Sequence, residues 1–277
     1  MLCGCQARVR PVASAGYSDL IHPSVRWQTV RPTALSYALT WLVGVAALPV
    51  VTNTLIDTLP RTARNRLLAI CESVDLVSGH IVSASDAPTR HVYFPTGSIL
   101  SLTTSSKDSP VLEVGMVGSE GMLGLQVVLA VASVPLQASV RGAGTAWRVA
   151  TEPFNRELAG SRALQQSLNG YLQVTLLQFT SEARCVRFHQ IHQRLARWLL
   201  MTHDRTHADS FSVTQALIAR MLGVRRVGIA KAAGTFRRTG LIRYVRGVLT
   251  IVDRKALESE SCACYESARK TYARFMS

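Results

Sequence analysis

The sequence predicts an α+β fold, with short strands in its first half and helices in its second. Between about Val74 and Val149, turn residues recur every ten or so positions and separate short apolar or alternating runs, which is typical of an antiparallel, jelly-roll-like β-roll. After Phe154 the apolar residues change to helical spacing, and no proline follows Pro153. A chain of 277 residues is also longer than one hydrophobic core usually serves. We therefore expect a β-roll domain, a long helix and a mainly helical C-terminal domain.

The expected strands lie between turns rich in glycine, proline and serine. The clearest turns are Ser78-Gly79, Ser85 to Pro88, Pro95 to Gly97, Ser105 to Asp108 and Arg141 to Gly144. The clearest strand-like runs are Val92–Phe94, Ile99–Thr103, Val111–Val117 and Ala138–Val140.

A long helix is predicted from about Ala163 to Cys185, a span of about 23 residues or roughly 35 Å. That length exceeds what a small roll needs, so we expect its apolar stripe to pair with a second copy as a parallel coiled coil across a two-fold axis. The residues assigned to this dimerisation contact are Leu168, Leu172, Leu176 and Phe179. The alternative is a helix that lies only on its own domain. A second helix, Ile191–Thr202, is expected to cover the last domain.

The segment from Gln215 to Ala232 meets the stereochemical demands of a helix-turn-helix. Counting from Gln215, the fifth residue must be small where two helices cross, and it is Ala219. The ninth must accept a left-handed turn, and it is Gly223. Five further positions must be apolar, and they are Ile218, Leu222, Val224, Ile229 and Ala232. Downstream, two strand-like runs around Arg246-Gly247 predict a wing.

These elements place polar side chains where DNA would lie. Arg225, Arg226 and Lys231 fall on the outward, N-terminal half of the second helix, the part that enters the major groove. An arginine there can donate two hydrogen bonds to one guanine. Thr214 and Gln215 at the start of the first helix, and Arg246 in the wing, are expected to contact phosphates.

The distribution of charge agrees with a nucleic-acid partner. Residues 190–277 hold 16 Lys and Arg against 6 Asp and Glu, a net charge of +10, whereas residues 51–189 hold 11 against 10. A basic C-terminal part beside a near-neutral middle is the electrostatic pattern of phosphate binding. For each arginine taken singly, an ordinary solvated surface charge is the alternative.

Residues 1–50 differ in composition from the rest. No charged residue occurs from Pro32 to Ile56, and Ala34–Val51 is largely apolar. Since an amphipathic segment begins at Val51, we expect residues 1–50 to be a dispensable extension, and a chain that starts at Val51 to dimerise and bind DNA. The alternative is a membrane-tethered sensor anchored by residues 32–56.

The cysteines and histidines do not form a recognisable metal motif. Six cysteines are too sparse for a disulfide scaffold, and we expect reduced thiols in a cytoplasmic protein, with no metal or other cofactor. The six are Cys3, Cys5, Cys71, Cys185, Cys262 and Cys264. The pairs His189/His192 and His203/His207 have the spacing of helical metal ligands, but no paired carboxylate or nucleophile accompanies them. We expect surface or hinge histidines and no enzymatic activity.

With a β-roll, a long helix and a winged helix-turn-helix in this order, the chain resembles the Crp/Fnr superfamily of bacterial transcription regulators over about residues 55–270. The resemblance is carried by Arg90–Gly97, Val114–Gly124, Arg194–Met201 and the helix-turn-helix. It implies a homodimer that binds a palindromic site in double-stranded DNA and recruits or blocks RNA polymerase. It divides the chain into an extension (1–50), a cyclic-nucleotide-binding-like sensor (51–160), a dimerisation helix (161–189) and a DNA-binding domain (190–277).

In the cyclic-nucleotide-binding members, a Gly-Glu-Leu helix and a following Arg-Ser/Thr pair hold the nucleotide. The resemblance assigns the effector pocket here to Gly118, Glu120, Gly121, Val134, Pro135, Phe179 and Thr180. Val134 and Pro135 stand where the arginine and the hydroxyl would be, so the cyclic phosphate would lack its counter-charge. We therefore expect no response to cAMP and an effector of unknown identity. Val227 replaces a glutamate common in the recognition helix, so the operator should differ from the best-known consensus, and the Fnr cysteine spacing is absent.

Overall fold

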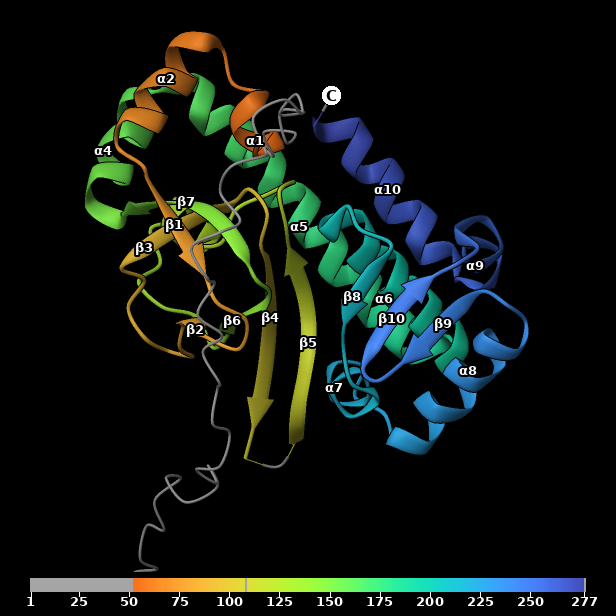
Figure 1. The fold of residues 1–277 in the computed structure, drawn as a ribbon. Helices are drawn as coiled ribbons and strands as arrows, with labels where there is room; N and C mark the ends of the chain where they lie inside the picture. Colours follow the sequence, from red (N-terminus) through yellow and green to blue (C-terminus); the bar gives the residue numbers. More distant parts are fainter. Residues whose placement is uncertain (1–51, 108, 277) are drawn as a thin grey trace, which may run out of the picture. The chain divides into compact units, whose positions relative to one another are not determined.

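The computed structural model describes residues 52–107 and 109–276, all within one compact unit, Pro49–Ser277 (Figure 1). The first part of this unit is a roll of two antiparallel sheets, with strand orders β1-β7-β3 and β2-β6-β4-β5. The strands are β1 (Glu72–Leu76), β2 (Ile81–Ser83), β3 (His91–Pro95), β4 (Ile99–Ser106), β5 (Ser109–Val117), β6 (Gln137–Gly142) and β7 (Gly144–Ala150). The four strand-like runs of the sequence lie within β3, β4, β5 and β6, which confirms the predicted β-roll.

Short helices accompany the roll: α1 (Thr54–Asp57), α2 (Arg61–Ala69), α3 (Leu125–Val128) and α4 (Thr151–Gly160). Asn53 caps α1, because its side-chain oxygen accepts a hydrogen bond from the Ile56 N–H at 3.2 Å. The Asn53 amide donates to the Pro95 and Gly121 carbonyls at 2.9 and 2.8 Å, and so ties the start of α1 to the roll. Leu55 and Ile56 are buried in the roll core.

The stretch 32–56, the membrane anchor of the alternative hypothesis, lies mostly outside the described residues. Its last residues, 54–56, belong to α1 and hence to the packed roll. Among residues 52–107 and 109–276, no helix combines the length and the apolar character needed to span a membrane.

The predicted long helix is α5 (Arg162–Phe188), which has 27 residues. Its first half packs on the roll, where Leu164, Leu168 and Tyr171 are buried. The assignment of Leu168 to the dimer contact is therefore wrong, because the roll of the same chain covers this side chain completely. Further along, the roll no longer covers the helix, and Leu176 is 64% exposed.

The C-terminal part is a winged helix-turn-helix, as the sequence predicts. Its elements are α6 (Ile191–Thr206), β8 (Ser210–Ser212), α7 (Gln215–Met221), α8 (Arg226–Arg238), β9 (Ile242–Val245), β10 (Val248–Ile251) and α9 (Arg254–Glu260). The strands form one antiparallel sheet in the order β8-β10-β9, and Leu195, Ile218, Ile229 and Phe236 join its helices in one core. A last helix, α10 (Ala263–Met276), packs along α5 (Figure 1).

Gly121 is a position where the packing of α5 on the roll can be tested. A Cβ atom at Gly121 would stand 2.0 Å from the Tyr171 hydroxyl and 2.4 Å from its Cζ atom, and this ring is buried. We expect Gly121→Ala to lower the free energy of unfolding by about 1–3 kcal/mol, because a buried ring must move to admit the methyl group. Thermal unfolding of the variant measures the loss.

Gly234→Ala in α8 is the matched control. A Cβ at Gly234 would meet nothing within 4 Å, so this variant should keep or raise stability by about 0.5–1 kcal/mol through helix propensity. Equal melting temperatures for the two variants would contradict the packing assigned to Gly121.

Candidate nucleic-acid interface and effector cavity

The turn between α7 and α8 has the geometry that the sequence predicts. Gly223 has a φ of +61°, in the left-handed region that glycine adopts without strain. Ala219 is buried where the helices cross, and the five apolar positions all face the core of the domain. Arg194 of α6 is buried and donates to the carbonyl of Leu222, the C-cap residue of α7. The turn is therefore held both by packing and by a charged hydrogen bond.

The start of α8 is open to solvent. Arg225 is the N-cap residue and Arg226 the first residue of the helix, and both side chains are exposed, as is Lys231 further along. The inward face of α8 is apolar and consists of Ile229, Ala232, Ala233 and Phe236. A helix anchored on one side, with two arginines at its free N-terminal end, has the form of a helix that reads the major groove. Val227 is 72% exposed beside these arginines.

The start of α7 and the wing lie in the same domain as α8. Thr214 caps α7, because its hydroxyl oxygen accepts from the Leu217 N–H at 3.1 Å, while Gln215 begins the helix. The wing is the β9–β10 hairpin, whose two-residue turn has φ values of 48° at Arg246 and 81° at Gly247. Two left-handed residues form the hairpin turn that suits twisted strands, and the Arg246 side chain is exposed at its tip. Contact of these residues with DNA stays a prediction.

A cavity of about 180 Å³ lies between the roll and α5. The roll contributes Leu102, Val117 and Leu123, and α5 contributes Leu172 and Thr175. Of the residues assigned to an effector pocket, Val134 and Phe179 line this cavity. Its polar lining consists of side chains such as Ser83, Gln126 and Thr175, and no described residue that lines it is charged. The cavity therefore suits an uncharged, largely apolar molecule.

Pro135 and Thr180 do not line this cavity. Val134 and Leu136 line it, while Pro135 between them is exposed. Thr180 lies on another side of α5, in a groove beside α10.

Gly118, Glu120 and Gly121 do not line this cavity either, because they contact helices. The Glu120 carboxylate forms an ion pair with the Arg205 guanidinium of α6, with 2.7 Å between Nε and Oε1. Burial lowers the pKa of Arg205, but the charge of Glu120 together with the neighbouring Tyr272, Tyr171 and Asp204 raises the pKa above its ordinary value. Gly118 lies against Arg205, since an added Cβ would stand 2.8 Å from the Cγ of that side chain.

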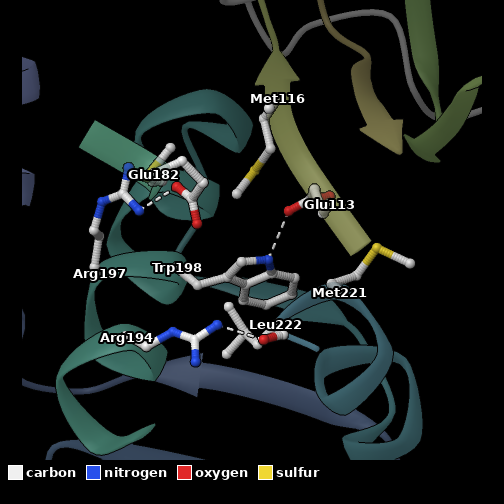
Figure 2. A pocket seen from close by; sticks show the side chains of 10 residues that line it. Glu113, Met116, Glu182, Arg194, Arg197, Trp198, Met221 and Leu222 are labelled. Atoms are coloured by element: carbon white, nitrogen blue, oxygen red, sulfur yellow. Dashed lines mark hydrogen bonds and ion pairs between the residues drawn. The ribbon is translucent and has the colours of Figure 1, made fainter. Parts of the chain in front are cut away.

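A buried polar junction between the roll and α6 has no counterpart in the sequence analysis. Glu113 of β5 accepts a hydrogen bond from the Trp198 indole N–H at 2.8 Å (Figure 2) and another from the Ser101 hydroxyl. Arg141 of β6 lies over the Trp198 ring, 4.2 Å from its centre, and its Nη1 is 3.4 Å from the Glu113 carboxylate. The other end of the Arg141 guanidinium donates to the Thr202 hydroxyl at 2.6 Å. The junction links three strands of the roll to the helix that supports the helix-turn-helix.

Comparison with known proteins agrees with this arrangement. Residues 193–260 match the Crp-like helix-turn-helix domain family, a segment that ends before α10. Comparison with curated protein sequences finds no match.

Solved structures share the fold across most of their length. FixK2 from Bradyrhizobium japonicum has a TM-score of 0.61 and 14% identity, covering 70% of this chain and 98% of FixK2. A transcriptional regulator of the Crp/Fnr family from Eubacterium rectale has a TM-score of 0.58 and 16% identity, covering 74% of this chain and 96% of its own. CLP, a c-di-GMP-responsive global regulator from Xanthomonas campestris, has a TM-score of 0.58 and 16% identity, covering 69% of this chain and 99% of CLP.

The chain joins a β-roll to a winged helix-turn-helix through a long helix, and the basic side chains at the start of α8 are exposed. Residues 193–260 thus match a Crp-like helix-turn-helix domain, and the described part of the chain has the fold of the solved Crp/Fnr regulators.

The roles of Arg226 and Arg246 are separable by experiment. Arg226→Ala should lower affinity for the operator about ten- to a hundredfold, because a bidentate arginine–guanine contact discriminates by about 1–3 kcal/mol. The loss should be confined to one base pair per half-site. Arg246→Gly keeps the left-handed turn and removes the charge. It should lower the affinity for all duplexes by about the same factor, and the slope of log K against log salt concentration should fall in magnitude by about one per subunit.

The measurement is a titration of both variants with operator and scrambled duplexes at several salt concentrations, which gives the affinity of each variant for each duplex. If Arg226→Ala weakens both duplexes by one factor, Arg226 is a phosphate contact, and base reading passes to Arg225 or Lys231.

Proposed function

We propose that the chain is a homodimeric transcription regulator that binds a palindromic operator through α8 and responds to an apolar small molecule instead of cAMP. The observation that carries the DNA-binding role is the exposed pair Arg225 and Arg226 at the start of α8. The fold family supports an action on transcription through RNA polymerase, recruited or blocked at the promoter.

The dimer contact is assigned to the part of α5 that the roll leaves uncovered. Positions 172, 176, 179, 183 and 186 follow the alternating three- and four-residue spacing of a coiled-coil seam, and all but Ala183 carry a larger apolar side chain. Leu176 is 64% exposed and Val186 is 39% exposed, so their burial needs a second surface. Two copies paired along this seam would be related by a two-fold axis, which presents two α8 helices to an inverted repeat.

The effector role of the cavity follows from its place beside this seam. Leu172, Leu176 and Phe179 belong to the seam and also line the cavity. A ligand there would contact the side chains that determine how two copies of α5 meet, so its binding energy could shift the dimer between arrangements. A charged nucleotide would meet no counter-charge among the described lining residues, and would lose its hydration without compensation.

Selection of bound fragments from random duplex DNA tests the DNA-binding role. We expect an inverted repeat whose half-sites are centred about one helical turn, roughly 34 Å, apart. Selection of single, unrepeated sites would overturn the two-fold arrangement, and failure to enrich any sequence would overturn specific DNA binding.

Leu176→Glu tests the dimer contact. A two-fold seam loses two buried leucines, each worth about 1.5–3 kcal/mol, so dimerisation should weaken about a hundredfold or more. Sedimentation of the full chain over a range of concentrations measures the change, and operator affinity should fall with it. Val77→Glu is the control, because Val77 is also exposed (54%) but lies in the turn between β1 and β2. Equal dimer affinities in the two variants would place the contact elsewhere.

Calorimetry with millimolar cAMP tests the choice of effector, and we expect no saturable heat. The apolar lining of the cavity offers the cyclic phosphate neither charge nor a row of donors. Saturation in the micromolar range would show that the nucleotide has another site or that the cavity rearranges around it.

A further inference from the structure

Four side chains from two segments that are far apart in the sequence meet at the base of the DNA-binding domain. Cys185 lies near the end of α5 and His189 is its C-cap residue, while Cys262 and Cys264 lie between α9 and the first turn of α10. One ligand atom from each of the four lies within 4.8 Å of all the others. All three cysteines are buried, and none of them forms a disulfide bond.

Two distances within this cysteine–histidine cluster match those around a single tetrahedral ion. Zinc with Zn–S bonds of about 2.3 Å and a Zn–N bond of about 2.0–2.1 Å sets the S···S distance at about 3.8 Å and the S···N distance at about 3.6 Å. The Cys185 and Cys262 sulfur atoms are 3.6 Å apart, and the Cys264 sulfur is 3.6 Å from the His189 Nδ1 atom. An iron–sulfur cluster distributes its ligands over several iron atoms and needs a wider cage.

The surroundings suit three thiolates around a divalent ion. Such a group carries one net negative charge, and the Arg184 guanidinium lies 3.6 Å from the Cys264 sulfur as a donor. The buried Arg197 of α6, paired with Glu182 of α5, adds a second positive charge nearby. Hydrogen-bond donors and cations around a thiolate site are the usual supports of a structural zinc ion.

We propose that Cys185, His189, Cys262 and Cys264 bind one Zn²⁺ ion. The ion joins the two ends of the DNA-binding domain, because α6 to α9 lie between the two pairs of ligands. It thereby fixes the connection from α5 to α6 and holds the first turn of α10 against α5. The proposal is independent of the operator and of the effector, since it rests on the four ligands alone.

Metal analysis of the full chain, purified under reducing conditions without a metal-affinity tag or chelator, is the first test. We expect roughly one zinc per chain in the wild type and in Cys71→Ser, whose thiol hydrogen-bonds to the Leu67 carbonyl in the roll. Cys262→Ser should contain less than about a tenth of that amount.

Cobalt substitution of the wild type gives a readout that does not depend on a variant that folds poorly. Tetrahedral Co²⁺ bound by three thiolates should show a sulfur-to-metal charge-transfer band and visible d–d bands. His189→Cys adds a fourth thiolate, so it should keep the metal and increase the charge-transfer intensity by about one third.

Three results would overturn the proposal. The first is a zinc-free wild type that gives no tetrahedral cobalt spectrum. The second is a wild type that contains iron and sulfide in place of zinc. The third is a disulfide bond between Cys185 and Cys262 in the freshly purified reduced protein, which would make the pair a redox couple.

Discussion

The buried carboxylate of Glu113 is the constraint on which the relation between roll and DNA-binding domain depends. A buried charge is tolerated only when it is paired and hydrogen-bonded. Removal of one partner leaves the desolvation cost of the other charge uncompensated. Glu113 accepts a hydrogen bond from Trp198 on α6 (Figure 2). Its other partners are Ser101 on β4 and Arg141 on β6. Separation of α6 from the roll would leave this carboxylate without its indole donor. The position of α6 is therefore set by the roll as well as by its own domain.

Helix α6 is bonded both to the roll and to the helix-turn-helix. Arg194 at its start donates to the end of α7, and Trp198 one turn later donates to the roll. On the roll side, β5 carries Glu113 and also Gly115, where an added Cβ would stand 3.2 Å from the Phe179 ring. Because Phe179 lines the cavity, one strand contacts both the cavity wall and the junction. A ligand that displaces Phe179 would change its contact with β5, and β5 is hydrogen-bonded to α6 through Glu113 and Trp198. Packed connections of this kind can couple two sites.

The parts of the structure that local stereochemistry determines were predictable from the sequence. Gly223 and Ala219 stand at fixed offsets in the helix-turn-helix, and two left-handed residues between strands make a hairpin turn, so both features are visible in a short window. Helical spacing showed that α5 has an apolar stripe but not which surface covers it. Leu168 of this stripe packs against the roll of the same chain. The cysteine–histidine cluster was not predictable, because its ligands come from two segments that only the fold brings together.

In the segment Gly118–Gly124, the same fold makes different contacts from those of the cyclic-nucleotide-binding proteins. In cyclic-nucleotide-binding members of the family this segment faces the ligand, whereas here the Glu120 side chain pairs with Arg205 and its carbonyl accepts from the Tyr272 hydroxyl of α10. The backbone approaches these helices so closely that a Cβ at Gly118 would meet Arg205 at 2.8 Å. A carboxylate that is already paired with a buried guanidinium is a poor hydrogen-bond acceptor for a ribose hydroxyl. The segment Gly118–Gly124 therefore holds the roll to α6 and α10.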